Sequence, residues 1–289
     1  KTYLQQEKYE EAMYHFELAG NRPGYSEAFW EVRNIGIQSA LGTLIIGLVA
    51  FLVLSKSLQI VNHKTGKITL WMTPVKRFFD KKLLKDLFYI FRVMRHPVDS
   101  FYEIKRGHRA TLLSAVILYV IFFLVYLNSS INNGFIYQFV APEDMDLSAI
   151  IIGFFSITMV LVISNYLDTS IHDGLGGLKQ IFIMFIYSMG PLMIAMLSTS
   201  MLSFVLTYNE AFFLNLLMIV GAGWSFINVF SGMIEIHDYT ARQTIKSLLM
   251  TVLFTVIIAV VIIILVMMWE QLYMFLEALI KEAIRNVIS

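Results

Sequence analysis

The stretch SLLMTVLFTVIIAVVIIILVMM, residues 247–268, decides the fold class. Its 22 residues contain no Lys, Arg, Asp or Glu. A hydrocarbon core about 30 Å thick requires roughly 20 apolar residues of helix. The stretch therefore predicts a membrane-spanning helix.

Five other uncharged runs are long enough to cross a membrane: 35–54, 111–128, 148–167, 180–206 and 211–233. The chain is 57% hydrophobic and 15% charged, whereas soluble domains usually contain about 25% charged residues. We predict an all-α integral membrane protein with six transmembrane helices. Gly190-Pro191 near the middle of the fourth run predicts a kink. The absence of cysteine excludes disulfides and thiolate chemistry.

The charges outside these runs predict the orientation of the chain. Segments 55–110, 168–179 and 234–246 hold 16 Lys/Arg and 8 Asp/Glu. The segments on the other side of the six runs, 1–34, 129–147, 207–210 and 269–289, hold 6 Lys/Arg and 13 Asp/Glu. Lys and Arg favour the cytoplasmic side, so we expect a multi-pass protein of the cell membrane with both termini extracellular.

The segment 1–34 predicts two short helices outside the membrane. Apolar residues recur at helical spacing over Tyr9 to Ala19, Asn21, Pro23 and Gly24 break the pattern, and a second run begins at Tyr25. The spacing resembles part of a tetratricopeptide repeat, although a simple helical stub before 35–54 explains it equally well. Because the chain begins at Lys1, we expect further sequence upstream.

The basic segment 55–110 predicts a hairpin over Leu58 to Leu70 and an amphipathic helix over Pro74 to Arg95. The apolar stripe of this predicted helix contains Phe79, Leu83, Leu87, Ile90, Phe91 and Met94. Residues expected to contact lipid or a partner are Lys76, Arg77, Phe79, Lys81, Lys82, Leu83, Lys85, Leu87, Phe91 and Arg92. Such a helix lies on a membrane with anionic lipids or docks on a cytoplasmic partner. Residues 269–289 predict a last, external amphipathic helix.

Polar residues within the runs suggest packing more than chemistry. No run carries a central charge, which disfavours a proton-coupled pump. Asn165, Asn215 and Asn228 are expected to hydrogen-bond between helices, and Gly221, Gly223 and Gly232 to allow close packing. The sequence contains no metalloprotease, nucleophile-elbow or phosphate-loop motif, so we predict no enzyme, no cofactor and no metal.

Two predicted cytoplasmic loops share the tripeptide Ile-His-Asp. Their polar residues, with one turn glycine, are His172, Asp173, Gly174, His237 and Asp238. Two His and two Asp could bind a divalent metal if the loops meet. The favoured interpretation is that these residues form helix caps and a tight turn.

From residue 95 onward the chain resembles the bacterial form of the YIP (Ypt-interacting-protein) domain family. The resemblance is carried by Arg95-His96-Pro97-x3-Phe101-Tyr102, Asn165-Tyr166-Leu167, Asp173-Gly174-x4-Lys179, Tyr187-x3-Pro191, Asn209-Glu210 and His237-x-Tyr239. It implies a five-helix bundle over 111–268, preceded by the added helix 35–54. The acidic Asp-Leu-Tyr-Gly-Pro motif of eukaryotic members is absent, so GTPase binding is not implied.

The resemblance implies an accessory membrane protein, since bacterial members are associated with ABC-type importers or fused to external repeats. We predict a non-catalytic scaffold that contacts membrane lipids and joins external repeats to a membrane complex, with transporter permease or ATPase subunits as partners and no nucleic acid. One alternative is a stand-alone transporter or channel for a neutral solute. Another is a membrane-shaping or trafficking protein.

Overall fold

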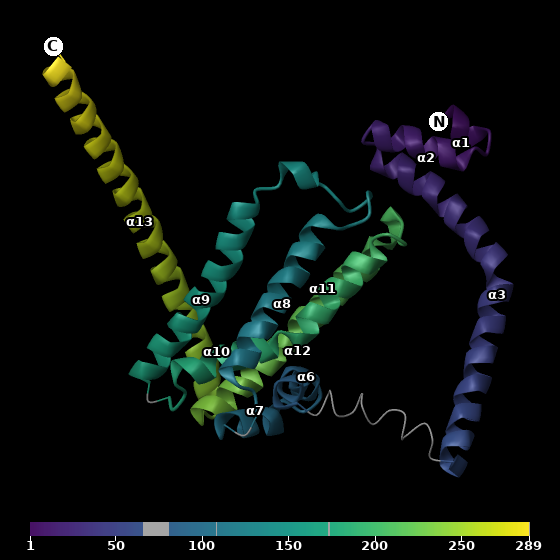
Figure 1. Cartoon of the computed structure of the whole chain (residues 1–289), viewed down its shortest axis with the longest axis horizontal. Coiled ribbons are helices and arrows are strands. Elements are labelled where there is room, and N and C mark those ends of the chain that lie inside the picture. The colour runs from purple at the N-terminus through teal and green to yellow at the C-terminus, as the bar shows by residue number, and fades with distance from the viewer. Residues whose placement is uncertain (66–80, 108, 173, 289) are drawn as a thin grey trace.

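The computed structural model describes residues 1–65, 81–107, 109–172 and 174–288. Over these ranges the chain forms helices, turns and loops, with no β-strand (Figure 1). The α-helices are α1 (Thr2–Gln5), α2 (Tyr9–Leu18), α3 (Arg22–Thr65), α6 (Lys82–Arg95), α7 (Pro97–Lys105), α8 (Leu112–Ile131), α9 (Leu147–Ile171), α10 (Leu178–Ser188), α11 (Gly190–Leu202), α12 (Ala211–His237) and α13 (Ala241–Ile288). Two 3-10 turns are η1 (Pro142–Asp144) and η2 (Tyr208–Glu210).

Five helical segments are long and apolar enough to cross a membrane: α8, α9, α10 with α11, α12 with η2, and α13. The helix α3 adds a sixth if its two parts, which meet at 50°, form one span. The predicted all-α membrane fold is therefore confirmed.

The loops and termini gather at two ends of the molecule (Figure 1). We call the end with α1, α2, η1 and η2 the acidic end, and the end with α6, α7 and the α12–α13 turn the basic end. These names follow the charge difference in the sequence.

The helix α10 lies at the centre of the bundle. Every residue from Ile181 to Ser188 is buried, as expected for a helix that packs against neighbours on all sides. Met184 packs so closely against Gly232 of α12 that a Cβ on this glycine would lie 2.6 Å from the methionine side chain. Tyr119 of α8 adds ring contacts with α9 and α10.

The predicted kink at Gly190-Pro191 is confirmed, because α10 ends at Ser188 and α11 begins at Gly190. Proline lacks the amide hydrogen that would continue the hydrogen bonding of α10, but it fits the first turn of a new helix. Beyond this break, α11 and α12 approach closely at Gly221, where a Cβ would lie 2.4 Å from the Ala195 Cβ. The predicted close packing is confirmed at Gly221 and Gly232, whereas Gly223 faces open space.

Two predicted boundaries are wrong. The hairpin expected from Leu58 is instead the end of α3 as far as Thr65, and its remainder lies outside the described residues. Extending an existing helix costs less than starting a new element, and the sequence from 58 to 65 contains no glycine or proline to stop it. Residues 269–288 are not a separate helix, because α13 continues through them without a break.

The helix α2 and the start of α3 form an antiparallel pair at the acidic end. Phe16 of α2 packs against Ala28 and against Gly24, where a Cβ would lie 2.7 Å from the phenylalanine ring. The predicted helix near Tyr9 is confirmed. The second helix begins at Arg22 rather than Tyr25, because Pro23 fits within its first turn.

Candidate functional site

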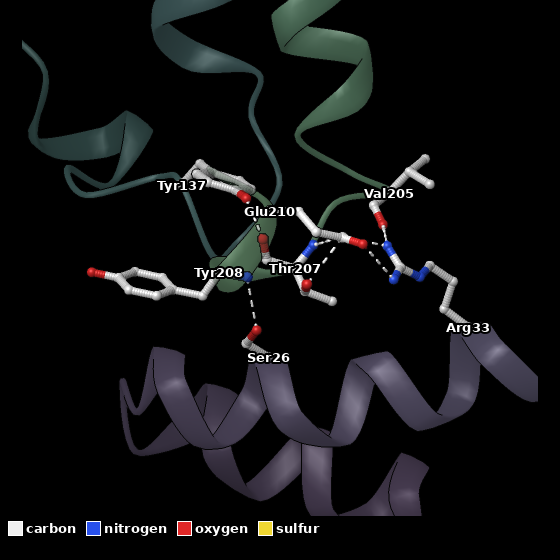
Figure 2. A network of polar contacts seen from close by, with 7 residues as sticks. All are labelled: Ser26, Arg33, Tyr137, Val205, Thr207, Tyr208 and Glu210. Atoms are coloured by element: carbon white, nitrogen blue, oxygen red, sulfur yellow. Dashed lines mark hydrogen bonds and ion pairs between the residues drawn. The ribbon is translucent and has the colours of Figure 1, made fainter. Parts of the chain in front are cut away.

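The candidate site is the junction at which α3 contacts the bundle at the acidic end (Figure 2). The guanidinium of Arg33 donates two parallel hydrogen bonds to the Glu210 carboxylate, from Nη1 to Oε2 at 2.6 Å and from Nη2 to Oε1 at 3.0 Å. Nη1 also donates to the carbonyl of Val205 at 2.8 Å. A two-point, charge-assisted pair of this kind fixes orientation as well as distance.

The turn η2 holds Glu210 ready for this pair. Thr207 donates to Oε2 from its backbone N–H at 2.8 Å and from its hydroxyl at 3.0 Å. This is one half of a capping box, in which the acidic side chain satisfies the backbone that precedes it.

Glu210 lies in the connecting segment 207–210, before the uncharged run 211–233 begins. The helical segment Tyr208–His237 has 30 residues and is roughly 45 Å long, which is more than a core about 30 Å thick requires. The Arg33 and Thr207 hydrogen bonds lower the pKa of Glu210 from 4.5 to about 2, although partial burial opposes them. The carboxylate is therefore ionised at neutral pH.

Further hydrogen bonds hold the junction together on either side of this pair. The backbone N–H of Tyr208 donates to Ser26 Oγ at 2.8 Å, and the Tyr137 hydroxyl donates to the Thr207 carbonyl at 2.6 Å. Arg22 donates to the carbonyl of Gln138 at 2.7 Å and places its guanidinium over two phenylalanine rings. The start of α3 is thus bound to two connecting segments of the bundle.

A pocket of about 410 Å³ opens beside these contacts. Its charged and aromatic lining comes from Glu27, Trp30 and Glu31 of α3 and Tyr208 of η2. Carboxylates next to aromatic rings favour a cationic group, by charge and through the ring faces. The junction thus offers a binding surface.

A comparison with protein families matches the Yip1 domain to residues 91–264. The chain belongs to the Yip1-domain family. No curated protein and no solved structure matches it. In this Yip1-domain protein, Glu210 lies inside the matched region and Arg33 lies before it, so the junction joins the Yip1 domain to the helices that precede it.

The sequence interpretation missed the junction. Thr207-x-x-Glu210 is a recognisable capping pattern, so the turn could have been found locally. The pairing of Arg33 with this turn could not have been found in the sequence, because 177 positions separate Arg33 from Glu210.

The predicted basic helix is present as α6, and its apolar stripe faces the bundle in part. Of the stripe, Ile90 is buried, Leu83, Leu87 and Met94 are partly buried, and Phe91 is 48% exposed. The buried face also includes Asp86, Tyr89 and Val93, which the stripe did not contain. The Tyr89 hydroxyl donates to Glu103 at 2.8 Å and the Tyr187 hydroxyl donates to the Asp86 carbonyl at 2.7 Å, so polar contacts hold this face against its neighbours.

The residues predicted for lipid or partner contact separate into two groups on α6. Lys81, Lys82, Lys85 and Arg92 are exposed, and Leu83 and Leu87 are partly buried. Lys76, Arg77 and Phe79 lie outside the described residues.

The two His-Asp loops meet only in part. The ring of His237 accepts a hydrogen bond from the Gly176 N–H at Nδ1 and contacts Asn165 Oδ1 through Nε2, both at 3.2 Å. An Nδ1 that accepts carries no proton, so this geometry requires the neutral ring with its proton on Nε2. Asn165 also donates to Thr251 of α13 at 3.0 Å, which confirms its predicted role between helices.

The other predicted residues of this cluster have partners elsewhere. His172 pairs with Asp168 at 2.9 Å, and Asp238 pairs with Lys105 at 2.5 Å. Gly174 lies against Tyr239 and allows the loop to pack closely, while Asp173 lies outside the described residues. Within the described ranges, no three His, Cys, Asp or Glu side chains are grouped in a way that could hold a metal.

The remaining two asparagines do not follow the prediction. Asn215 is exposed. Asn228 is buried, yet neither polar atom of its side chain has a hydrogen-bond partner in the described part of the chain.

Proposed function

We propose that this Yip1-domain protein is a non-catalytic membrane scaffold that couples helices at the acidic end to a membrane complex. The observation that carries the proposal is the two-point pair between Arg33 and Glu210, which ties the N-terminal helices to the bundle. Membership of the Yip1-domain family supports a membrane protein with a non-catalytic role.

The α2–α3 pair supports the proposal because it leaves large apolar side chains exposed. Tyr14 is 60% exposed and Leu18 is 69% exposed, while only Ala12, Phe16 and Ala28 form the small core between the helices. Tetratricopeptide-like helix pairs behave in this way, since each pair completes its packing against the next repeat. We therefore assign the pair the role of a repeat unit that stacks on neighbouring helices.

The proposed partner of the membrane part is an ABC-type solute importer in a bacterial cell membrane, with the acidic end extracellular. The charge difference between the two ends supports this orientation through the preference of Lys and Arg for the cytoplasm. The exposed apolar side chains along α3, from Ile45 to Leu54, offer a surface for a neighbouring subunit.

The experiment is photo-crosslinking from the junction in intact membranes. A photoreactive amino acid replaces Trp30, and purification in mild detergent is followed by mass spectrometry of the crosslinked products. We expect a transporter permease or ATPase subunit in a fixed ratio, reduced when Glu210→Gln is also present and unchanged by Glu143→Gln in η1.

Recovery of a monomer with no transporter subunit contradicts the proposal. Reconstitution of the protein alone in liposomes provides a second measurement. Solute flux without any partner would instead support the stand-alone transporter.

A further inference from the structure

The helix α6 borders an apolar groove of about 290 Å³ that runs between α6, α8 and α11. Its lining includes Leu118 and Ile121 of α8, Met193 and Ile194 of α11, and Phe88 and Phe91 of α6. The lining extends over eight residues of both α8 and α11, which corresponds to about 10 Å along each helix. All the lining residues are apolar.

A pocket with cationic side chains meets this groove at Phe88. The pocket measures about 350 Å³ and is lined by Lys85, Phe88, Tyr89, Arg92 and Arg109. Three of these side chains are cationic and none is acidic. The groove and the pocket therefore place hydrocarbon and positive charge on either side of one phenylalanine.

Arg92 is positioned for this pocket by its neighbours. One guanidinium nitrogen donates to Glu103 at 2.9 Å, and the guanidinium lies over the Tyr89 ring at 5.8 Å. Its side chain remains 50% exposed, so its other N–H groups can reach a second anion. Arg109 has no hydrogen bond or ion pair to any residue that the structure describes.

We propose that the α6 groove and pocket bind one anionic phospholipid, with its phosphate at Arg92 and Arg109 and an acyl chain between α8 and α11. The groove lies on membrane-spanning helices, where lipid chains are the surrounding medium. An extended peptide in a lining without polar groups would leave its own N–H and C=O groups unsatisfied, whereas an acyl chain has none. Basic pockets beside spanning helices recognise anionic head groups in the same way.

The test is a lipid titration of the delipidated full chain by native mass spectrometry, with phosphatidylglycerol and phosphatidylcholine as the probes. We expect phosphatidylglycerol to bind about tenfold more tightly than phosphatidylcholine, because cationic side chains attract a net negative head group more strongly than a zwitterionic one. Arg92→Gln with Arg109→Gln should abolish this difference. The matched control is Arg242→Gln with Lys246→Gln, which removes two exposed charges from α13 near the same end.

A second variant tests the groove separately. Ile194→Trp fills the apolar space and should weaken binding of both lipids, while the preference for the anionic head group persists. Equal affinity for the two lipids would overturn the proposal. So would an equal loss in the α13 control, which would indicate attraction by overall charge. If only Ile194→Trp weakens lipid binding, the groove binds phospholipids without regard to head-group charge, and the proposed anionic site is refuted.

Discussion

Replacing Glu210 with glutamine tests whether the Arg33 pair holds α3 against the bundle. Glutamine keeps the size of the side chain and one accepting oxygen, but it removes the charge that accepts two hydrogen bonds from Arg33. Such a change should free the start of α3 from η2 without altering the membrane-spanning helices.

The magnitude follows from the geometry of the pair. A carboxyl pKa lowered from 4.5 to about 2 corresponds to at most about 3 kcal/mol. The Arg33 and Glu210 side chains are 16% and 30% exposed, so solvent screens part of this attraction. Part of the lowering of the Glu210 pKa comes from the two hydrogen bonds that Thr207 donates, and the side-chain oxygen of glutamine can still accept these. We expect a loss of about 1–2 kcal/mol in docking free energy.

Hydrogen exchange at the backbone amide of Tyr208 measures this loss directly. That N–H donates to Ser26 Oγ on α3, so it is protected only while α3 is docked. Glu210→Gln should accelerate its exchange about 5- to 30-fold, since each 1.4 kcal/mol is a factor of ten. Glu143→Gln, the same change at an exposed position in η1, should have no effect. Unchanged Tyr208 exchange in Glu210→Gln would refute the reasoning.

Three further predictions concern other parts of the molecule. Because the folded-state pKa of Glu210 is lowered, its contribution is complete above pH 4.5 and should disappear as the pH falls towards 2, as measured by the same exchange assay. Gly221→Ala should destabilise the detergent-solubilised protein by about 1–3 kcal/mol because the added Cβ collides with α11, whereas Gly223→Ala, which faces open space, should be neutral or stabilising in thermal unfolding. Asn165→Leu should cost about 1–3 kcal/mol because it leaves buried polar groups on α12 and α13 without a partner, whereas the exposed Asn215→Leu should not lower the melting temperature.

The junction and the α6 groove are two separate candidate binding regions. The first lies at the acidic end and includes residues from before the Yip1 domain. The second lies near the basic end, on α6, α8 and α11. These two regions are the ones to which we assign the proposed partner contact and the proposed lipid contact.

The sequence by itself determined the membrane class, the positions of the spanning runs and the break at Gly190-Pro191. These are local properties, because a run either has or lacks the length and apolarity that a bilayer requires. The kink is local too, since proline removes a backbone donor wherever it occurs.

Only the tertiary structure decided which faces meet. The face of α6 that packs into the bundle includes Tyr89 as well as Ile90 of the predicted stripe, because Tyr89 and Tyr187 have polar partners in other elements. The pair between Arg33 and Glu210 joins residues from distant parts of the chain, and the sequence around either residue does not indicate that the two will pair. Hydrogen bonds and ion pairs are short-ranged and directional, so they became visible only once the helices were placed in space.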